Sequence, residues 1–183
     1  METRKAGRHD RAGRGGGRRV QVFASPLGPL VLHDDGHALT ALDYGAAQPP
    51  PAAADKPSPL AEQALAALQS YFSGPHGPAQ ADGLMAALPL APAGTPFQRR
   101  VWASLRAIPP GQTRTYGELA RELGTSARAV GQACRTNPLA ILVPCHRVVA
   151  AHGLGGYSGA VQGQELERKT WLLRHEGALR DGL

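Results

Sequence analysis

Two adjacent residues in the second half of the chain, Cys145 and His146, have the types that a thiolate nucleophile requires. The apolar residues 141–143 lead into the pair, so we expect the thiol to lie in the interior. Pro144 has no amide proton and restricts the residue before it, which denies Cys145 a regular helical or ladder setting. The thiolate is the reactive form of cysteine, and a nearby base or cation lowers the thiol pKa. The alternative is a buried core cysteine beside a solvated His-Arg pair, because free cysteine is often buried.

The composition is that of a globular protein with many loops. Of the 183 residues 42% are hydrophobic and 19% are charged, and there are 23 glycines and 16 prolines. A chain of this length suits one or two small domains. The formal net charge of +6 suits a polyanionic partner without proving one. Residues 1–19 hold seven arginines and lysines against two acids, so they predict a disordered basic tail.

Targeting and redox signals favour a reduced compartment. The two cysteines, Cys134 and Cys145, are too few for a disulfide framework. No apolar stretch is long enough to span a membrane, and the charged N-terminus lacks the apolar core of a secretory signal. We expect a cytoplasmic protein without a membrane partner, and we identify no metal ligands and no cofactor motif.

The first half of the chain predicts a small domain of antiparallel strands and one helix. Alternating residues separated by turns indicate strands, and apolar residues at helical spacing indicate the helix. The strands are expected at 20–25, 30–33 and 37–43, the helix at 60–72, and loops at 46–59 and 73–96.

The second half predicts helices, two of them in a helix-turn-helix. After a helix at 97–108, Thr115 and Glu118 form a capping box that opens a short helix ended by Gly124. Thr125 or Ser126 caps the next helix, which runs to about residue 135. Two short helices joined by a glycine-containing turn are typical of a DNA-binding helix-turn-helix, although many αα-hairpins look the same.

The second helix of this pair has one face of small residues beside a face with two arginines. Small residues let a helix backbone approach a groove closely, and arginines meet phosphates or enter the base stack. The alternative is that the small face packs against the first helix and the arginines are solvated. The small residues are Ala127, Gly131 and Cys134, and the adjacent polar residues are Arg128, Gln132 and Arg135.

A loop and a last helix follow the Cys-His pair. Residues 150–156 predict a flexible loop, and Tyr157-Ser-Gly159 could wall a pocket. The helix is expected at 164–176, with a Glu165–Lys169 ion pair at i,i+4. Its inward residues are expected to be Leu166, Thr170 and Leu173, with Trp171 and Leu172 broadening the apolar face.

Taken together, these motifs resemble the O6-alkylguanine-DNA alkyltransferases, also called methylated-DNA–protein-cysteine methyltransferases. They cover nearly all of residues 94–183 in the order of that family, and Ser25-Pro-Leu-Gly-Pro29 extends the likeness weakly into the first half. The motifs are Phe97-Gln-Arg-Arg-Val-Trp102, Tyr116-Gly-Glu-Leu-Ala120, Arg128-Ala-Val-Gly131, Asn137-Pro138, Pro144-Cys-His-Arg147, Tyr157-Ser-Gly159 and Trp171-Leu-Leu-Arg-His-Glu-Gly177.

The resemblance implies a chemistry for three residues. Cys145 would accept the alkyl group from O6 of guanine, and from O4 of alkylthymine, in one irreversible turnover. His146 would be the base and would act through a water, because neighbours in an extended chain point in opposite directions. Glu176 would hold the imidazole ring and favour its charged form, as the acid does in catalytic triads.

The resemblance also implies how alkylated double-stranded DNA is held. The nucleotide would be flipped out through the minor groove, with Arg128 filling the space that it leaves. Tyr116 would contact the 3′ phosphate and donate towards guanine N3. Asn137 would fix the turn before the nucleophile, and Arg147 would pair within the domain. The carbonyl of Val148 with Tyr157 and Ser158 would line the guanine pocket, and further DNA contacts would come from Gly117, Thr125, Ala127, Ala129, Gly131 and Arg135.

Several departures from the family pattern are visible. Residues 160–165 lengthen the segment after Tyr157, and Ala140 stands where some members have proline. Both could change the pocket. The zinc ligands of some N-terminal domains and the cysteine cluster of a phosphotriester-repair domain are not matched. Position 145 is cysteine and not the tryptophan of alkyltransferase-like proteins, which bind lesions without removing the alkyl group.

The sequence therefore predicts an α+β protein that acts as a monomer in direct-reversal DNA repair. Residues 1–19 form the basic tail, 20–93 a supporting domain of antiparallel sheet and helix, and 94–183 a helical DNA-binding methyltransferase domain. Two other functions stay open at this point. A sequence-specific regulator would not need the Pro-Cys-His-Arg element, and a cysteine hydrolase would turn over many times.

Overall fold

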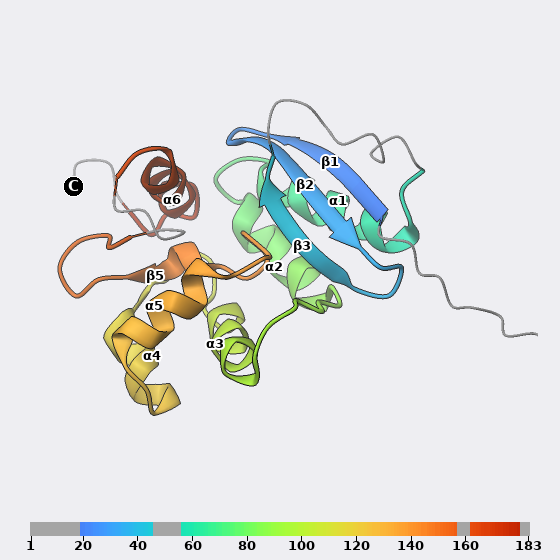
Figure 1. Cartoon of the computed structure of the whole chain (residues 1–183). Helices are drawn as coiled ribbons and strands as arrows, with labels where there is room; N and C mark the ends of the chain where they lie inside the picture. Colours follow the sequence, from blue (N-terminus) through green and yellow to red (C-terminus); the bar gives the residue numbers. More distant parts are fainter. Residues whose placement is uncertain (1–18, 46–55, 157–161, 180–183) are drawn as a thin grey trace, which may run out of the picture.

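The computed structural model describes residues 19–45, 56–156 and 162–179, and they form the predicted α+β fold (Figure 1). In chain order the described elements are β1 (Arg19–Ser25), β2 (Gly28–Asp34), β3 (Leu39–Tyr44), α1 (Pro59–Tyr71), α2 (Gly77–Ala87), α3 (Pro96–Arg106), β4 (Arg114–Thr115), α4 (Tyr116–Leu123), α5 (Ala127–Arg135), the 3-10 turn η2 (Cys145–Arg147), β5 (Val148–Val149) and α6 (Gln164–His175). Residues 1–18, most of the predicted tail, lie outside the described residues, and Arg19 belongs to β1.

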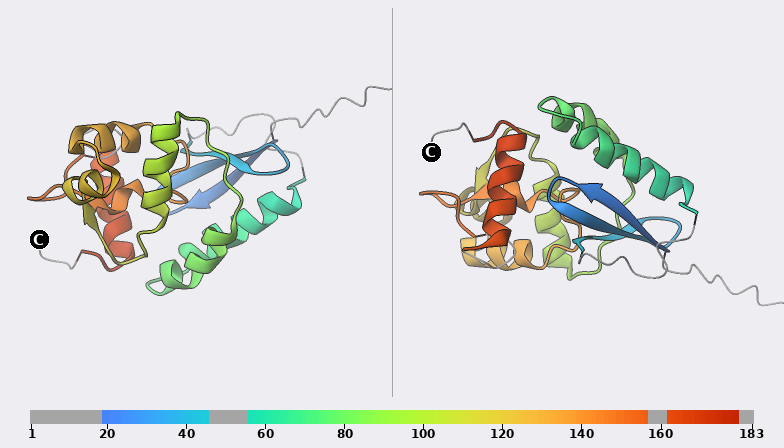
Figure 2. Two further views of the ribbon diagram at one scale, coloured as in Figure 1. Left: turned by 90° about the horizontal axis from the view of Figure 1, so that it is seen from below. Right: turned by 90° about the horizontal axis from the view of Figure 1, so that it is seen from above.

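The three predicted strands form an antiparallel sheet in the order β1-β2-β3. Val22 lies opposite Val31, and Leu32 lies opposite Leu42, so the hairpin and the third strand are confirmed. Leu30 and Leu32 alternate along β2 and are both buried, as expected for one apolar face of a strand. Helices α1 and α2 lie together on one side of this sheet in both views of Figure 2.

Helix α2 contradicts the prediction that residues 73–96 are loop-rich. Pro78 stands in the first turn of α2, where a helix tolerates proline because the missing amide proton has no intrahelical acceptor. Ala81 and Met85, four residues apart, are buried against the core. Packing of this narrow stripe on α1 supports a helix that the local sequence only weakly specifies.

The helix-turn-helix elements are present as predicted. The amide of Glu118 donates to Thr115 Oγ1 at 3.1 Å, and the amide of Thr115 donates to Glu118 Oε2 at 2.6 Å, which completes the capping box. Gly124 ends α4 with a positive φ of 62°, a conformation that glycine adopts without a Cβ clash. Ser126 caps α5 by accepting from the amide of Ala129 at 3.2 Å.

The N-terminal sheet supports the segment that leads to Cys145. The amide of Leu42 in β3 donates to the Pro138 carbonyl at 2.8 Å, and the amide of Ala140 donates back to the Leu42 carbonyl at 3.1 Å. Buried residues of both halves form one continuous hydrophobic cluster. A division of the chain into domains near residue 93 stays a prediction.

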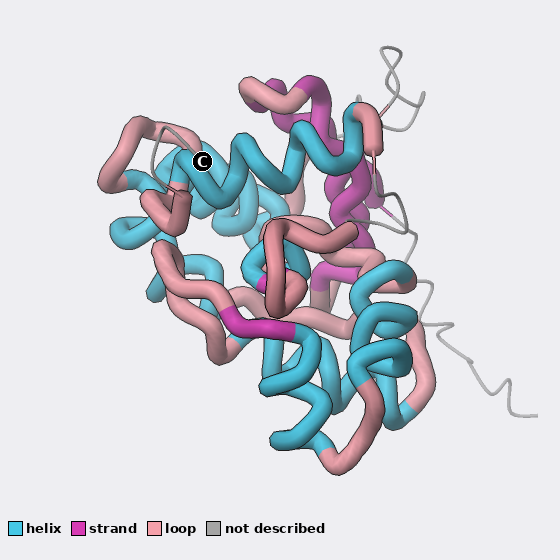
Figure 3. The backbone as a smooth tube through the Cα atoms, turned by 90° about the vertical axis from the view of Figure 1, so that its left-hand side faces the viewer, coloured by secondary structure: helices cyan, strands magenta, loops and turns pink. Residues whose placement is uncertain are grey.

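A short parallel pair, β4 with β5, was not predicted. Arg114 lies opposite Val148, and Thr115 opposite Val149. Strands of two residues carry too little pattern to be recognised in a sequence. This pair places Tyr116, the first residue of α4, beside the chain that follows Cys145. In the tube view of Figure 3, helices lie around this short pair of strands.

The described residues show neither a membrane-spanning helix nor a cluster of metal-binding side chains. No described helix combines the length and the apolar character needed to cross a bilayer. In the same part of the chain, no group of three or more His, Cys, Asp and Glu side chains is placed to hold a metal ion.

Candidate active site

Two tight turns deliver Cys145 to the interior. The amide of Leu142 donates to the Ala140 carbonyl, and the amide of Cys145 donates to the Val143 carbonyl, both at 2.8 Å across two residues. Ile141, at the centre of the first turn, has a φ of 69°, which is rare for a β-branched residue and costs about 1–3 kcal/mol. Its side chain is 2% exposed, so core packing holds this conformation.

Cys145 lies in a 3-10 turn, and the expectation of an extended chain at this point was wrong. The amide of Arg147 donates to the Pro144 carbonyl at 3.0 Å and closes the turn. Pro144 stands just before the turn, where its missing amide proton is not needed. With three residues per turn, the Cys145 and His146 side chains still diverge by about 120°.

The side-chain amide of Asn137 fixes this segment and also contacts the sulfur. Its oxygen accepts from the amide of Leu139 at 3.0 Å, and its nitrogen donates to the Val143 carbonyl at 2.7 Å. These are the turn-fixing contacts expected from the sequence. The same nitrogen lies 3.3 Å from Cys145 Sγ, within the range of a hydrogen bond to sulfur. A donor at this distance stabilises a thiolate more than a thiol.

His146, Arg147 and Glu176 form a buried charged cluster. The His146 Nε2–Glu176 Oε1 distance is 2.9 Å, so the predicted contact is present. Arg147 donates to both carboxylate oxygens, from Nε to Oε2 and from Nη2 to Oε1, at 2.8 Å each. Arg147 also donates from Nη1 to the Ile108 carbonyl. The pairing partner expected for Arg147 within the domain is therefore Glu176 itself.

The cluster sets the protonation of its members. Burial lowers the pKa of His146, the Glu176 carboxylate opposes this effect, and the charges of Arg147 and Lys169 add to it. Burial raises the pKa of Glu176, but its contacts with His146 and Arg147 outweigh burial and hold that pKa far below its usual value. The imidazole is therefore neutral and the carboxylate charged near neutral pH. Nδ1 of His146 has no hydrogen-bond partner among the described residues and is the nitrogen left to accept a proton.

Lys169 contradicts the predicted ion pair with Glu165. Its side chain is fully buried, and Nζ donates to the carbonyls of Val148 and Leu154 at 2.6 Å and of Gly156 at 3.0 Å. Arg168 takes the place of Lys169 as the partner of Glu165. The spacing of the predicted inward residues could have indicated this burial. Lys169 falls three residues after Leu166 and four before Leu173, on the same face of the helix.

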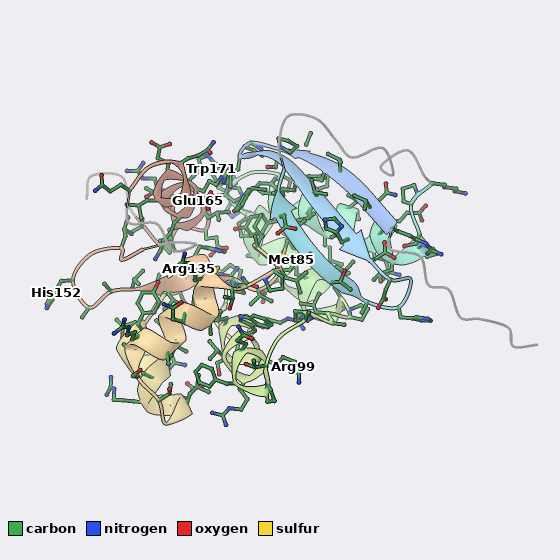
Figure 4. All side chains as sticks on the ribbon, viewed as in Figure 1. Met85, Arg99, Arg135, His152, Glu165 and Trp171 are labelled. Carbon is green, nitrogen blue, oxygen red and sulfur yellow. The ribbon has the colours of Figure 1, made fainter. Side chains whose placement is uncertain are left out.

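Lys169 thus ties α6 to the backbone after Cys145. Burial lowers the pKa of Lys169 to about 8, and the electrostatic interaction with Cys145 and Cys134 opposes that shift. The Tyr116 hydroxyl donates to the Gly156 carbonyl at 3.1 Å, the same oxygen that Lys169 contacts. Tyr116 and Lys169 together hold the loop that begins at Ala150, whose tip carries His152 (Figure 4).

The remaining predicted site residues fall into two groups, those expected to contact DNA and those expected to line the guanine pocket. Those predicted to contact DNA lie on α4, α5 and the turn between them, with Arg135 near the end of α5 (Figure 4). Val148 is buried, and its carbonyl accepts from Lys169 while keeping a second lone pair. Gly117, Ala127, Arg128 and Arg135 are exposed, Thr125, Ala129 and Gly131 are half-buried, and Tyr157 and Ser158 lie outside the described residues.

Comparison with known proteins decides the family. A family model described as "6-O-methylguanine DNA methyltransferase, DNA binding domain" matches residues 96–178. A methylated-DNA–protein-cysteine methyltransferase of Shigella flexneri is 41% identical in an alignment of 178 positions that covers 87% of this chain and 95% of that protein. The chain belongs to the methylated-DNA–protein-cysteine methyltransferase family. A relative of the same name from Methanosarcina acetivorans is 37% identical and covers 86% of this chain and 97% of its own.

Solved structures of the methyltransferase family agree in fold. The crystal structure of Mycobacterium tuberculosis O6-methylguanine methyltransferase has a TM-score of 0.68 and 36% identity, covering 91% of this chain and 97% of that one. A crystal structure of Mycobacterium tuberculosis OGT in complex with DNA has a TM-score of 0.67 and 37% identity, over 87% and 93%. Membership in the methyltransferase family assigns this chain to DNA repair by transfer of an alkyl group from DNA to a protein cysteine.

Proposed function

We propose that Cys145 accepts the alkyl group of O6-alkylguanine, and of O4-alkylthymine, in double-stranded DNA, once per protein molecule. One observation carries this proposal: a buried thiol, 5% exposed, has an amide donor 3.3 Å from its sulfur, and the next residue, His146, is buried and contacts the buried Glu176. At the second thiol, Cys134, burial raises the pKa well above the usual range. A thiol that stays protonated is a poor nucleophile.

The transfer is a displacement at the alkyl carbon. The Cys145 proton passes through a water to Nδ1 of His146, and the resulting imidazolium is stabilised by Glu176. The sulfur then forms a bond to the alkyl carbon as the bond between that carbon and O6 breaks. The electron pair stays on the guanine, which becomes neutral when it accepts a proton. A thioether has no ionisable proton and is a poor leaving group, so the protein is consumed.

We propose that Tyr116 assists the departing guanine. The resemblance gives it a donor role towards N3 of the base. In this structure its hydroxyl donates to the Gly156 carbonyl, and burial raises its pKa well above the usual value, so it remains protonated. We propose that the flipped base replaces Gly156 as the acceptor, while Lys169 keeps the loop in place. The Tyr157-Ser158 segment and the Val148 carbonyl would border the same base.

We propose that the α4–α5 unit enters the minor groove and that Arg128 occupies the space of the flipped nucleotide. Arg128 is the second residue of α5 and is exposed, next to Ala127 and Ala129. Short neighbours allow the helix start to approach the DNA backbone, and the helix N-terminus favours phosphate. The contacts of Gly117, Thr125, Gly131 and Arg135, action as a monomer, and a cytoplasmic location are parts of the same proposal.

The stoichiometry of transfer tests the proposed reaction. We expect duplex DNA carrying O6-[methyl-³H]methylguanine to leave one labelled methyl group per protein molecule, even with DNA in excess. Cys145→Ser should acquire no label, and Cys134→Ser, which alters the neighbouring buried thiol, should acquire as much as the unchanged protein. Release of many methyl groups per molecule would contradict the proposal and indicate a hydrolase. Sequence-specific DNA binding with no transfer would indicate a regulator.

A further inference from the structure

A residue of the N-terminal half reaches the buried charged cluster. Tyr71, the last residue of α1, is fully buried, and its hydroxyl donates to Glu176 Oε1 at 2.7 Å. The backbone carbonyl of Tyr71 accepts from His175 Nε2 at 2.7 Å. The end of α1 is therefore fixed to the end of α6 by two polar contacts. Neither contact was predicted, because their partners are more than a hundred residues apart in the chain.

The Tyr71 hydroxyl and the His146 ring share one carboxylate oxygen. Glu176 Oε1 accepts from Tyr71 at 2.7 Å, from Arg147 Nη2 at 2.8 Å and from His146 Nε2 at 2.9 Å. Burial raises the pKa of Tyr71, and the Glu176 charge raises it further, so the hydroxyl stays protonated and acts as a donor. Each donor to Oε1 draws negative charge from the oxygen that faces His146.

The charges around His146 decide how easily it gains a proton. A stronger negative charge on Glu176 favours the imidazolium, whereas donors that withdraw this charge favour the neutral ring. A base must be neutral before it can accept the thiol proton. Among the described residues, ionisable groups that act on His146 or Glu176 come from three elements: Tyr71 from α1, Arg147 from η2 and Lys169 from α6.

We propose that Tyr71 is a positioning residue of the active site. Its hydroxyl holds Glu176 Oε1 in place and reduces the negative charge on that oxygen. His146 is therefore neutral before alkyl transfer. This inference rests on the proposed function of His146 as the base. It gives the N-terminal half a part in the chemistry beyond support of the fold. Arg147 supplies part of this effect, and the Tyr71 hydroxyl adds to it, because both donate to Oε1.

A purely structural role for Tyr71 must be separated from this one. Its ring packs edge-on against Phe72, with centroids 5.0 Å apart, and against His175 at 5.3 Å. Tyr71→Phe keeps the ring and removes only the hydroxyl. Leu68→Ala is the matched control, because Leu68 is fully buried one turn earlier in α1 and forms part of the same hydrophobic cluster.

The test measures the rate of alkyl transfer from free O6-benzylguanine to the full chain, over the range in which histidine titrates, about pH 5 to 8. We expect Tyr71→Phe to shift the acidic limb of the rate profile to higher pH. At neutral pH the rate should fall roughly five- to tenfold, the size of one typical net hydrogen bond. Leu68→Ala should lower stability and leave the position of the limb unchanged.

A second measurement follows the His146 ring directly by NMR titration. Its midpoint should rise in Tyr71→Phe and fall when Tyr71 is replaced by 3-fluorotyrosine, whose more acidic hydroxyl is a stronger donor. The proposal is overturned if the unchanged protein transfers the benzyl group but neither the rate profile nor the His146 midpoint responds to the Tyr71 changes. Absence of transfer in the unchanged protein would instead refute the proposed function.

Discussion

Glu176→Gln is expected to slow alkyl transfer by about a hundredfold or more, the range of a lost positioned acid–base group. A neutral amide cannot stabilise the imidazolium that forms when His146 takes the thiol proton. The same change leaves the buried Arg147 without a counter-charge, which costs about 3–5 kcal/mol of unfolding free energy. Rates with free O6-benzylguanine and denaturant unfolding measure the two effects. Glu167→Gln, an exposed change on the same helix, should alter neither.

The stability lost in Glu176→Gln should depend on pH. Glu176 has a folded-state pKa far below the ordinary 4.5, so its carboxylate stabilises the fold above that ordinary value. The contribution is lost as the pH falls through the window between the ordinary and the folded pKa. The difference in unfolding free energy between the two proteins should therefore be constant near neutral pH and shrink in acid. A difference that grows in acid would contradict the assigned charge of Glu176.

Arg128→Ala is expected to weaken repair of duplex DNA by roughly tenfold to a hundredfold, because holding a base out of the stack costs a few kcal/mol. Attack on free O6-benzylguanine needs no flipping and should be nearly unchanged. Arg99→Ala is a matched control that removes one exposed arginine from α3 (Figure 4). Equal losses of Arg128→Ala with duplex and free base would remove the flipping role.

The sequence predicted those elements whose local signals are strong. The capping box at Thr115 and Glu118 and the αL glycine at 124 specify α4 through contacts within a few residues. Alternation in β1 to β3 specified the sheet for the same reason. Helix α2 was missed because its proline and glycine resemble breakers, and only tertiary packing supports it.

The candidate site could be predicted for residues that lie in the family motifs, but not for residues outside those motifs. Cys145 and His146 are neighbours in the chain, but their link to Glu176 spans 30 residues and was inferred from the family motifs. The hydroxyl of Tyr71 carries no local sign of its target, since a tyrosine at helical spacing predicts core packing. The strained turn at Ile141 depends on burial of that side chain, which the apolar run alone does not reveal.

Peptide mass spectrometry after reaction with O6-methylguanine duplex DNA tests the central claim most directly. The claim is that the thiol between the two tight turns and the His-Arg-Glu cluster is the alkyl acceptor. We predict a mass increase of one methyl group on the peptide that contains Cys145 and no change on the peptide that contains Cys134. A methyl group on Cys134, or repaired DNA with both peptides unmodified, would contradict this account.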